Sequence, residues 1–79
     1  MNAYEQYKRL FADALEIDIE SVEGLKYKDG SWDSVGHMSI IAVLEEHYNI
    51  VFEPEDIIAF DSFEEGIHIL GKYGIDISR

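Results

Sequence analysis

Apolar side chains recur every third or fourth residue over much of this chain, and this spacing restricts the fold more than any other feature. Over residues 3–15 the apolar positions with this spacing include Tyr4, Tyr7, Leu10, Phe11, Ala14 and Leu15. Residues three and four apart lie on one face of an α-helix, so this stripe predicts a helix that packs on a core. Asn2, with Glu5 three residues later, fits the start of that helix because the Asn side chain can accept from its free N–H groups.

A second helix is predicted over residues 33–48. Its predicted core face recurs at spacings of 3, 3 and 4 and consists of Met38, Ile41, Leu44 and Tyr48. A short third helix is expected over residues 54–60, because Pro54 suits a first helical turn. A fourth helix is expected to begin at Asp61-Ser62, where Ser62 and Glu65 form a capping box.

Residues 17–32 show no clean period, and their scattered apolar side chains predict a long ordered loop held against the core. The fold class expected from these patterns is all-α. We predict a small four-helix bundle with three main helices, one short helix and a long ordered loop between the first and second helices. A chain of 79 residues predicts a single domain spanning residues 1–79.

The chain contains no cysteine, which excludes disulfides and thiolate metal sites and favours a reducing compartment. Its first residues show no basic region followed by an apolar run, so no secretory signal is expected there. No apolar stretch approaches the roughly 20 residues that a membrane span needs. These features predict a soluble, cytoplasmic monomer that does not insert into membranes.

The charge of the chain is strongly negative. It carries 17 acidic residues against 6 Lys and Arg, a net charge of −11, and no Lys or Arg lies between Asp29 and Gly71. A phosphate backbone would be repelled, so nucleic acid is not an expected partner. Protein partners with basic patches are favoured instead.

The clearest candidate site is Asp33-Ser34, which directly precedes the apolar stripe of the second helix. A helix N-terminus has unpaired N–H groups and a partial positive charge, so a phosphodiester formed on Ser34 would be stabilised there. Asp33 can cap the helix, and its carboxylate can help to hold a divalent ion during phosphoryl transfer. Taken alone, these two residues also fit a plain helix cap, because Asp and Ser are among the commonest caps.

The surrounding sequence distinguishes these interpretations. The elements Asp33-Ser34, Val35, Leu44-Glu45-Glu46, Tyr48 and Ile50 occur in order and closely resemble the pattern of the acyl carrier protein family. The resemblance extends from about Ala3 to Tyr73. Gly36 and Ser39 stand where many carriers of fatty acid synthesis have acids. In this respect the chain looks more like the stand-alone carriers of specialised pathways.

The resemblance implies that a magnesium-dependent phosphopantetheinyl transferase attaches 4′-phosphopantetheine from coenzyme A to Ser34, with Asp33 supporting, which makes the chain a phosphoprotein. The arm would carry acyl or aminoacyl groups as thioesters. An acyl- or aminoacyl-activating enzyme would load it, and downstream synthases or transferases of fatty acid, polyketide, nonribosomal peptide or other specialised biosynthesis would use the cargo. The carrier would be a substrate and shuttle, with no catalytic residues of its own.

Any enzyme that accepts this arm must approach along the second helix, because Ser34 heads it. The face opposite the predicted core stripe is therefore the predicted partner surface. It carries Val35, Ala42, Val43 and Glu46, with Glu45 at its edge.

Other interpretations of these residues are weaker. Asp33, Ser34 and His37 are the residue types of a hydrolytic triad, but the chain lacks a Gly-x-Ser-x-Gly elbow, and one helical turn rarely gives triad geometry. The three histidines lack metal-ligand spacing, and the segment beginning at Asp29 lacks the Gly and Glu of an EF-hand loop, so no metal site is expected. One alternative stays open: an unmodified acidic helical adaptor that binds basic surfaces of partner proteins.

Overall fold

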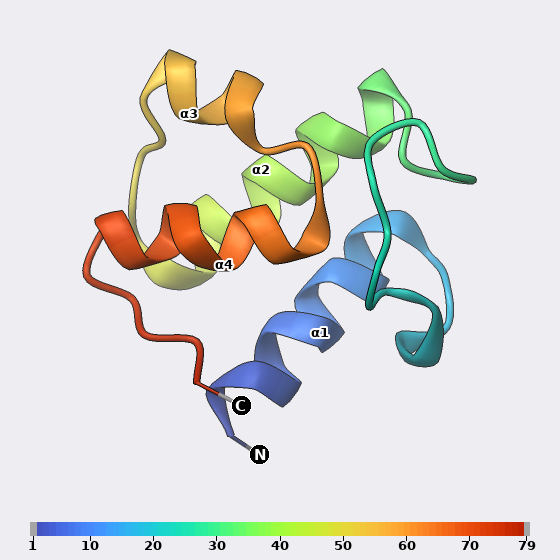
Figure 1. Ribbon diagram of the computed structural model, residues 1–79, viewed down its shortest axis with the longest axis horizontal. Coiled ribbons are helices and arrows are strands. Elements are labelled where there is room, and N and C mark those ends of the chain that lie inside the picture. Colours follow the sequence, from blue (N-terminus) through green and yellow to red (C-terminus); the bar gives the residue numbers. More distant parts are fainter. Residues whose placement is uncertain (1, 79) are drawn as a thin grey trace.

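The computed structural model describes residues 2–78, and in that range it contains four α-helices and no strand. The helices are α1 (Ala3–Leu15), α2 (Ser34–Tyr48), α3 (Pro54–Ala59) and α4 (Phe63–Lys72), and a 3-10 turn, η1 (Ile19–Ser21), follows α1. Figure 1 shows the long α1–α2 connection, cyan to green, at one side of the molecule and the short α3 near α4. The predicted small all-α fold of four helices, with the third one short, is confirmed.

The helix starts follow from local side-chain bonds. The Asn2 side chain accepts from the Glu5 N–H at 2.8 Å, and Ser62 Oγ accepts from the Glu65 N–H at 2.9 Å. Pro54 occupies the first turn of α3, where its missing N–H costs nothing. The three predicted helix starts are therefore confirmed.

An aromatic cluster joins α1 and α4 to the connection between α1 and α2. Phe11 of α1 packs edge-on against Trp32, with ring centroids 5.0 Å apart, and against Phe63 of α4, at 5.2 Å. The Tyr7 hydroxyl donates to the Phe63 carbonyl at 2.8 Å, so this buried polar group is satisfied. A Cβ at Gly66 would overlap the Tyr7 hydroxyl and the Phe60 ring. Glycine at this position lets α4 approach the cluster closely.

The inward face of α2 differs from the predicted one. Ile40, Ile41 and Leu44 are buried, but Met38 is 55% exposed. Assigning Met38 to the core was wrong, because α2 is apolar on most of its faces and its periodicity does not identify the buried side. In the first turns of α2 it is His37 that meets Trp32 and α3.

The connection between α1 and α2 is held against the rest of the chain at several points. Val22 and Trp32 are fully buried. Backbone bonds join the Tyr27 N–H to the Asp61 carbonyl and the Phe63 N–H to the Leu25 carbonyl, each at 2.9 Å. The segment that precedes Ser34 therefore lies along the turn between α3 and α4. Within residues 2–78, no helix is both long and apolar enough to cross a membrane.

Candidate functional site

Ser34 is the first residue of α2, and its side chain is exposed. The residue before it caps the helix: Asp33 Oδ1 accepts from the Gly36 N–H at 2.9 Å, and the Asp33 carbonyl accepts from the His37 N–H at 2.8 Å. Asp33 thus meets the need for a cap that would otherwise fall to Ser34. The Ser34 hydroxyl stands at a helix N-terminus without being required to build it.

Gly36 brings the first turn of α2 close to its surroundings. A Cβ on Gly36 would lie 2.5 Å from the Ser31 carbonyl oxygen and 2.9 Å from Leu15 Cδ2. The first contact is with backbone, so a side chain here would push the loop away from α2. The sequence pattern showed Gly36 only as a missing acid, whereas the structure gives it a steric role beside Ser34.

Tyr27 is the neighbour of Ser34 that sequence reasoning missed. Its hydroxyl lies 3.2 Å from Ser34 Oγ, at hydrogen-bond distance. The two residues are seven positions apart and lie on different segments, the loop and α2, so no helical or strand spacing indicates the pair. The only available signal was an aromatic residue in a polar loop.

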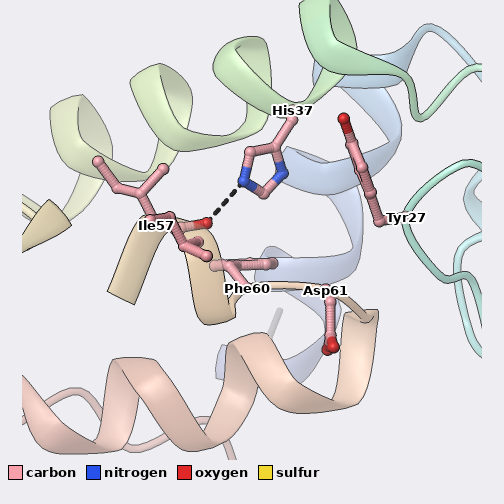
Figure 2. Close-up of a pocket in the computed structure, with 6 residues that line it drawn as sticks. Tyr27, His37, Ile57, Phe60 and Asp61 are labelled. Atoms are coloured by element: carbon pink, nitrogen blue, oxygen red, sulfur yellow. Dashed lines mark hydrogen bonds between the residues drawn. The ribbon is translucent and has the colours of Figure 1, made fainter. Parts of the chain in front are cut away.

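His37 links three segments of the site. The Trp32 indole Nε1–H donates to His37 Nδ1 at 3.0 Å, and His37 Nε2 lies 2.8 Å from the Ile57 carbonyl oxygen (Figure 2). An indole can only donate, so Nδ1 is the acceptor and Nε2 carries the proton that it donates to Ile57. Both ring nitrogens are engaged, which leaves neither to act as a base for Ser34.

A pocket of about 260 Å³ lies between α2, α3 and the loop. Its lining is mostly apolar and consists of Tyr27, His37, Ile57, Ile58, Phe60 and Asp61 (Figure 2). Tyr27 forms one wall of the pocket and also touches Ser34 Oγ, so the pocket begins beside the candidate attachment point. Sequence analysis did not indicate this pocket, because its walls come from three separate segments.

A second polar cluster fixes α3 to the end of α4. Asp56 is only 5% exposed, and its two carboxylate oxygens accept from Lys72 Nζ and from the Tyr73 hydroxyl, each at 2.6 Å. Tyr73 in turn accepts from the Glu53 N–H at 2.7 Å. The bonds from Lys72 and Tyr73 hold the pKa of Asp56 below its usual value. Nothing local to residue 56 in the sequence indicates its partners, which lie 16 and 17 positions away.

The predicted partner residues of α2 differ in exposure. Val35 is 76% exposed, and Ala42 and Glu46 are exposed, whereas Val43 is half-buried. The Glu45 carboxylate accepts from the Phe52 N–H at 3.0 Å, so this acid fixes the chain that follows α2. Two further apolar side chains are exposed near the site: Met38, one turn after Val35, and Ile58 at the pocket, 82% exposed.

Comparison with protein families, with curated proteins and with solved structures finds no match for this chain. Among residues 2–78, no group of three or more His, Asp or Glu side chains is placed to hold a metal ion.

Proposed function

We propose that the protein is an acyl carrier whose Ser34 bears a 4′-phosphopantetheine arm. One observation carries the proposal: an exposed serine hydroxyl stands at the first position of a 15-residue helix that is capped by the preceding aspartate. A serine that served only as a cap would point its hydroxyl at the N–H groups of the first turn, and here Asp33 makes that bond. The order of residues around it, which resembles the carrier family, supports the same assignment.

The electrostatics of the site suit the attached group. The first turn of α2 presents N–H groups and the positive end of the helix dipole to Ser34, and both favour an anionic phosphodiester. The cap occupies Oδ1 of Asp33, and the carboxylate can contribute its second oxygen to a divalent ion held by the transferase. Asp33 therefore supports the transfer as well as the helix. In this proposal the protein supplies a nucleophilic hydroxyl and does not itself catalyse the transfer. We assign the protein to the cytoplasm.

The proposed partners approach along α2. Val35, Ala42 and Glu46 are exposed on the side away from Ile40 and Leu44, and Val43 borders them. Met38 joins this surface because it is exposed, and Glu45 borders it while holding the Phe52 N–H. The net charge of −11 favours basic partner surfaces. Phosphopantetheinyl transferase, an acyl- or aminoacyl-activating enzyme and downstream synthases or transferases are the proposed partners.

Intact mass measured after incubation with coenzyme A, magnesium and a promiscuous phosphopantetheinyl transferase tests the proposal. A carrier gains the mass of one phosphopantetheine unit. A chain that stays unmodified, while still binding basic protein surfaces, is instead the acidic helical adaptor.

A further inference from the structure

The ring of Tyr27 makes the packing contacts of this residue, and a phenylalanine ring could make the same ones. The ring is half-buried and meets Trp32 and His37 edge-on, with centroids 6.3 and 5.4 Å away. The hydroxyl, in contrast, lies on the exposed side and meets Ser34 Oγ at 3.2 Å. The contact therefore joins the polar tip of an anchored aromatic side chain to the candidate nucleophile.

Backbone bonds hold Tyr27 in place independently of Ser34. Its N–H donates to the Asp61 carbonyl at 2.9 Å, and the N–H of the next residue, Lys28, donates to the Trp32 carbonyl at 2.7 Å. Lys28 adopts a left-handed backbone conformation with φ of 86°, which residues other than glycine rarely adopt. A tight local turn thus aims the Tyr27 ring at the start of α2.

We propose that Tyr27 is a positioning residue for the group carried on Ser34, an inference that rests on the carrier function proposed above. Before transfer, its hydroxyl holds Ser34 Oγ in one rotamer. After transfer, it donates a hydrogen bond to the phosphodiester. Tyr27 keeps its own proton in both states.

The first role follows from the freedom of a serine at a helix start. Its χ1 angle has three staggered positions, and serine hydroxyls readily turn to nearby backbone groups. Asp33 occupies the capping bond, and Tyr27 holds the hydroxyl away from the helix backbone. Fixing the nucleophile in one orientation removes part of the ordering that the transfer step otherwise requires.

The transfer step itself exchanges one phosphate bond for another. Ser34 Oγ forms a bond to the phosphorus of coenzyme A that bears the pantetheine unit. The bond from that phosphorus to the bridging oxygen of the pyrophosphate breaks, and adenosine 3′,5′-bisphosphate leaves. The proton of the Ser34 hydroxyl passes to a base on the transferase. Tyr27 takes no proton in this step; its hydroxyl only keeps the attacking Ser34 Oγ in place through their hydrogen bond.

The second role follows from the change in Ser34 Oγ on modification. As an ester oxygen it has no proton to donate, so a bond between the two side chains persists only with Tyr27 as the donor. The neighbouring phosphodiester oxygens are anionic and accept stronger hydrogen bonds than a neutral hydroxyl does. Because the Tyr27 ring also lines the pocket, this bond places the start of the arm at the pocket's edge.

Tyr27→Phe tests the proposal because it keeps the ring and removes only the hydroxyl. Tyr48→Phe is the matched control, since it makes the same change at the far end of α2, where the buried hydroxyl has no hydrogen-bond partner among the described residues. Initial rates of transfer from coenzyme A are measured over a range of carrier concentrations. Intact mass counts the attached groups, and circular dichroism verifies the helical content of both variants.

We expect Tyr27→Phe to lower kcat for transfer roughly 2–10-fold, the range that one hydrogen bond represents, with KM for the carrier near that of the wild type. We also expect the ³¹P resonance of the loaded variant to move towards that of the urea-unfolded loaded protein. Tyr48→Phe should change neither quantity. A structural role for Tyr27 would lower the melting temperature without moving the phosphorus resonance of the folded protein.

Two possible results separate the positioning role of Tyr27 from the carrier function. If the wild type gains mass and Tyr27→Phe matches it in either kcat or the ³¹P resonance, the positioning role is overturned while the carrier function stands. If the wild type gains no mass, the carrier function fails and the role of Tyr27 fails with it.

Discussion

The start of α2 and the junction of α3 with α4 each hold an aspartate near a helix start, and the two aspartates differ in what surrounds them. Asp33 is exposed, makes one capping bond to Gly36 and leaves the next side chain facing solvent. Asp56 is buried, and two side chains from the end of α4 bond both of its oxygens. The first arrangement leaves the Ser34 hydroxyl exposed, and the second forms a joint between α3 and the end of α4. The two residues are of the same type, but the burial of each carboxylate and the number of groups bonded to it distinguish their roles.

Asp56→Ala should lower the stability of the fold more than any substitution at Asp33 or on the exposed face of α2. It removes two charge-assisted bonds that hold α3, a helix of only six residues, to the end of α4. We expect a clear fall in melting temperature, measured by circular dichroism. Asp18→Ala is the control for the lost charge, because Asp18 is exposed and makes no side-chain capping bond. Equal melting temperatures for the two variants would show that the joint contributes nothing.

The same joint predicts a pH dependence. The bonds from Lys72 and Tyr73 hold the pKa of Asp56 below 3.8, its usual value. Because the folded pKa is lower than the unfolded one, the stabilisation is fully present above 3.8 and is lost as the pH falls through 3.8 towards the folded value. Urea denaturation at a series of pH values should show a steeper acid loss for the wild type than for Asp56→Ala. Parallel curves would contradict this assignment.

At the start of α2, two substitutions of Asp33 separate capping from charge. Asp33→Ala should cost about 1 kcal/mol of folding stability, because the Gly36 N–H loses its acceptor. Asp33→Asn should keep the cap and the stability, since Asn caps helices as well as Asp. Both should slow phosphopantetheine transfer, because both remove the carboxylate. Transfer at the wild-type rate in Asp33→Asn would limit Asp33 to its structural role.

The smallest effects are expected on the exposed face of α2. Val35→Asp should weaken transferase binding several-fold at every salt concentration, because burying Val35 contributes on the order of 1 kcal/mol. Glu46→Lys should mainly slow association at low salt, since an exposed ion pair contributes only about 0.2–1 kcal/mol. Both are measured as transfer kinetics across ionic strength. If both variants transfer normally while Lys8→Glu impairs transfer, the partner surface lies elsewhere.

Local patterns predicted more of this molecule than long-range ones. The starts of α1 and α4 follow from Asn2 and Ser62, because a cap depends on residues only three positions away. The buried face of α2 was not recoverable in full, since Met38 and Ile40 are both apolar and only packing decides which one turns inward.

The candidate site also divides into a part that local sequence indicates and a part that depends on long-range contacts. Asp33-Ser34 could be proposed as a site from the sequence because the two residues are adjacent. The contact of Tyr27 with Ser34 and the engagement of His37 depend on how the loop folds back along the α3–α4 turn, and no local spacing encodes that path. Gly36 illustrates the limit: the Ser31 carbonyl oxygen leaves no room for a Cβ at this position, and the sequence pattern could describe the residue only as an absent acid.

Site-resolved mass spectrometry tests most directly whether Ser34 is the attachment point. Wild-type protein and Ser34→Ala are each incubated with coenzyme A, magnesium and the transferase, then digested and sequenced by fragmentation. We predict one phosphopantetheine unit on Ser34 of the wild type. We predict none on Ser34→Ala, with helical circular dichroism nearly unchanged because the side chain is exposed. A wild type that gains no mass, or a Ser34→Ala variant modified at Ser31 or elsewhere, would contradict the assignment.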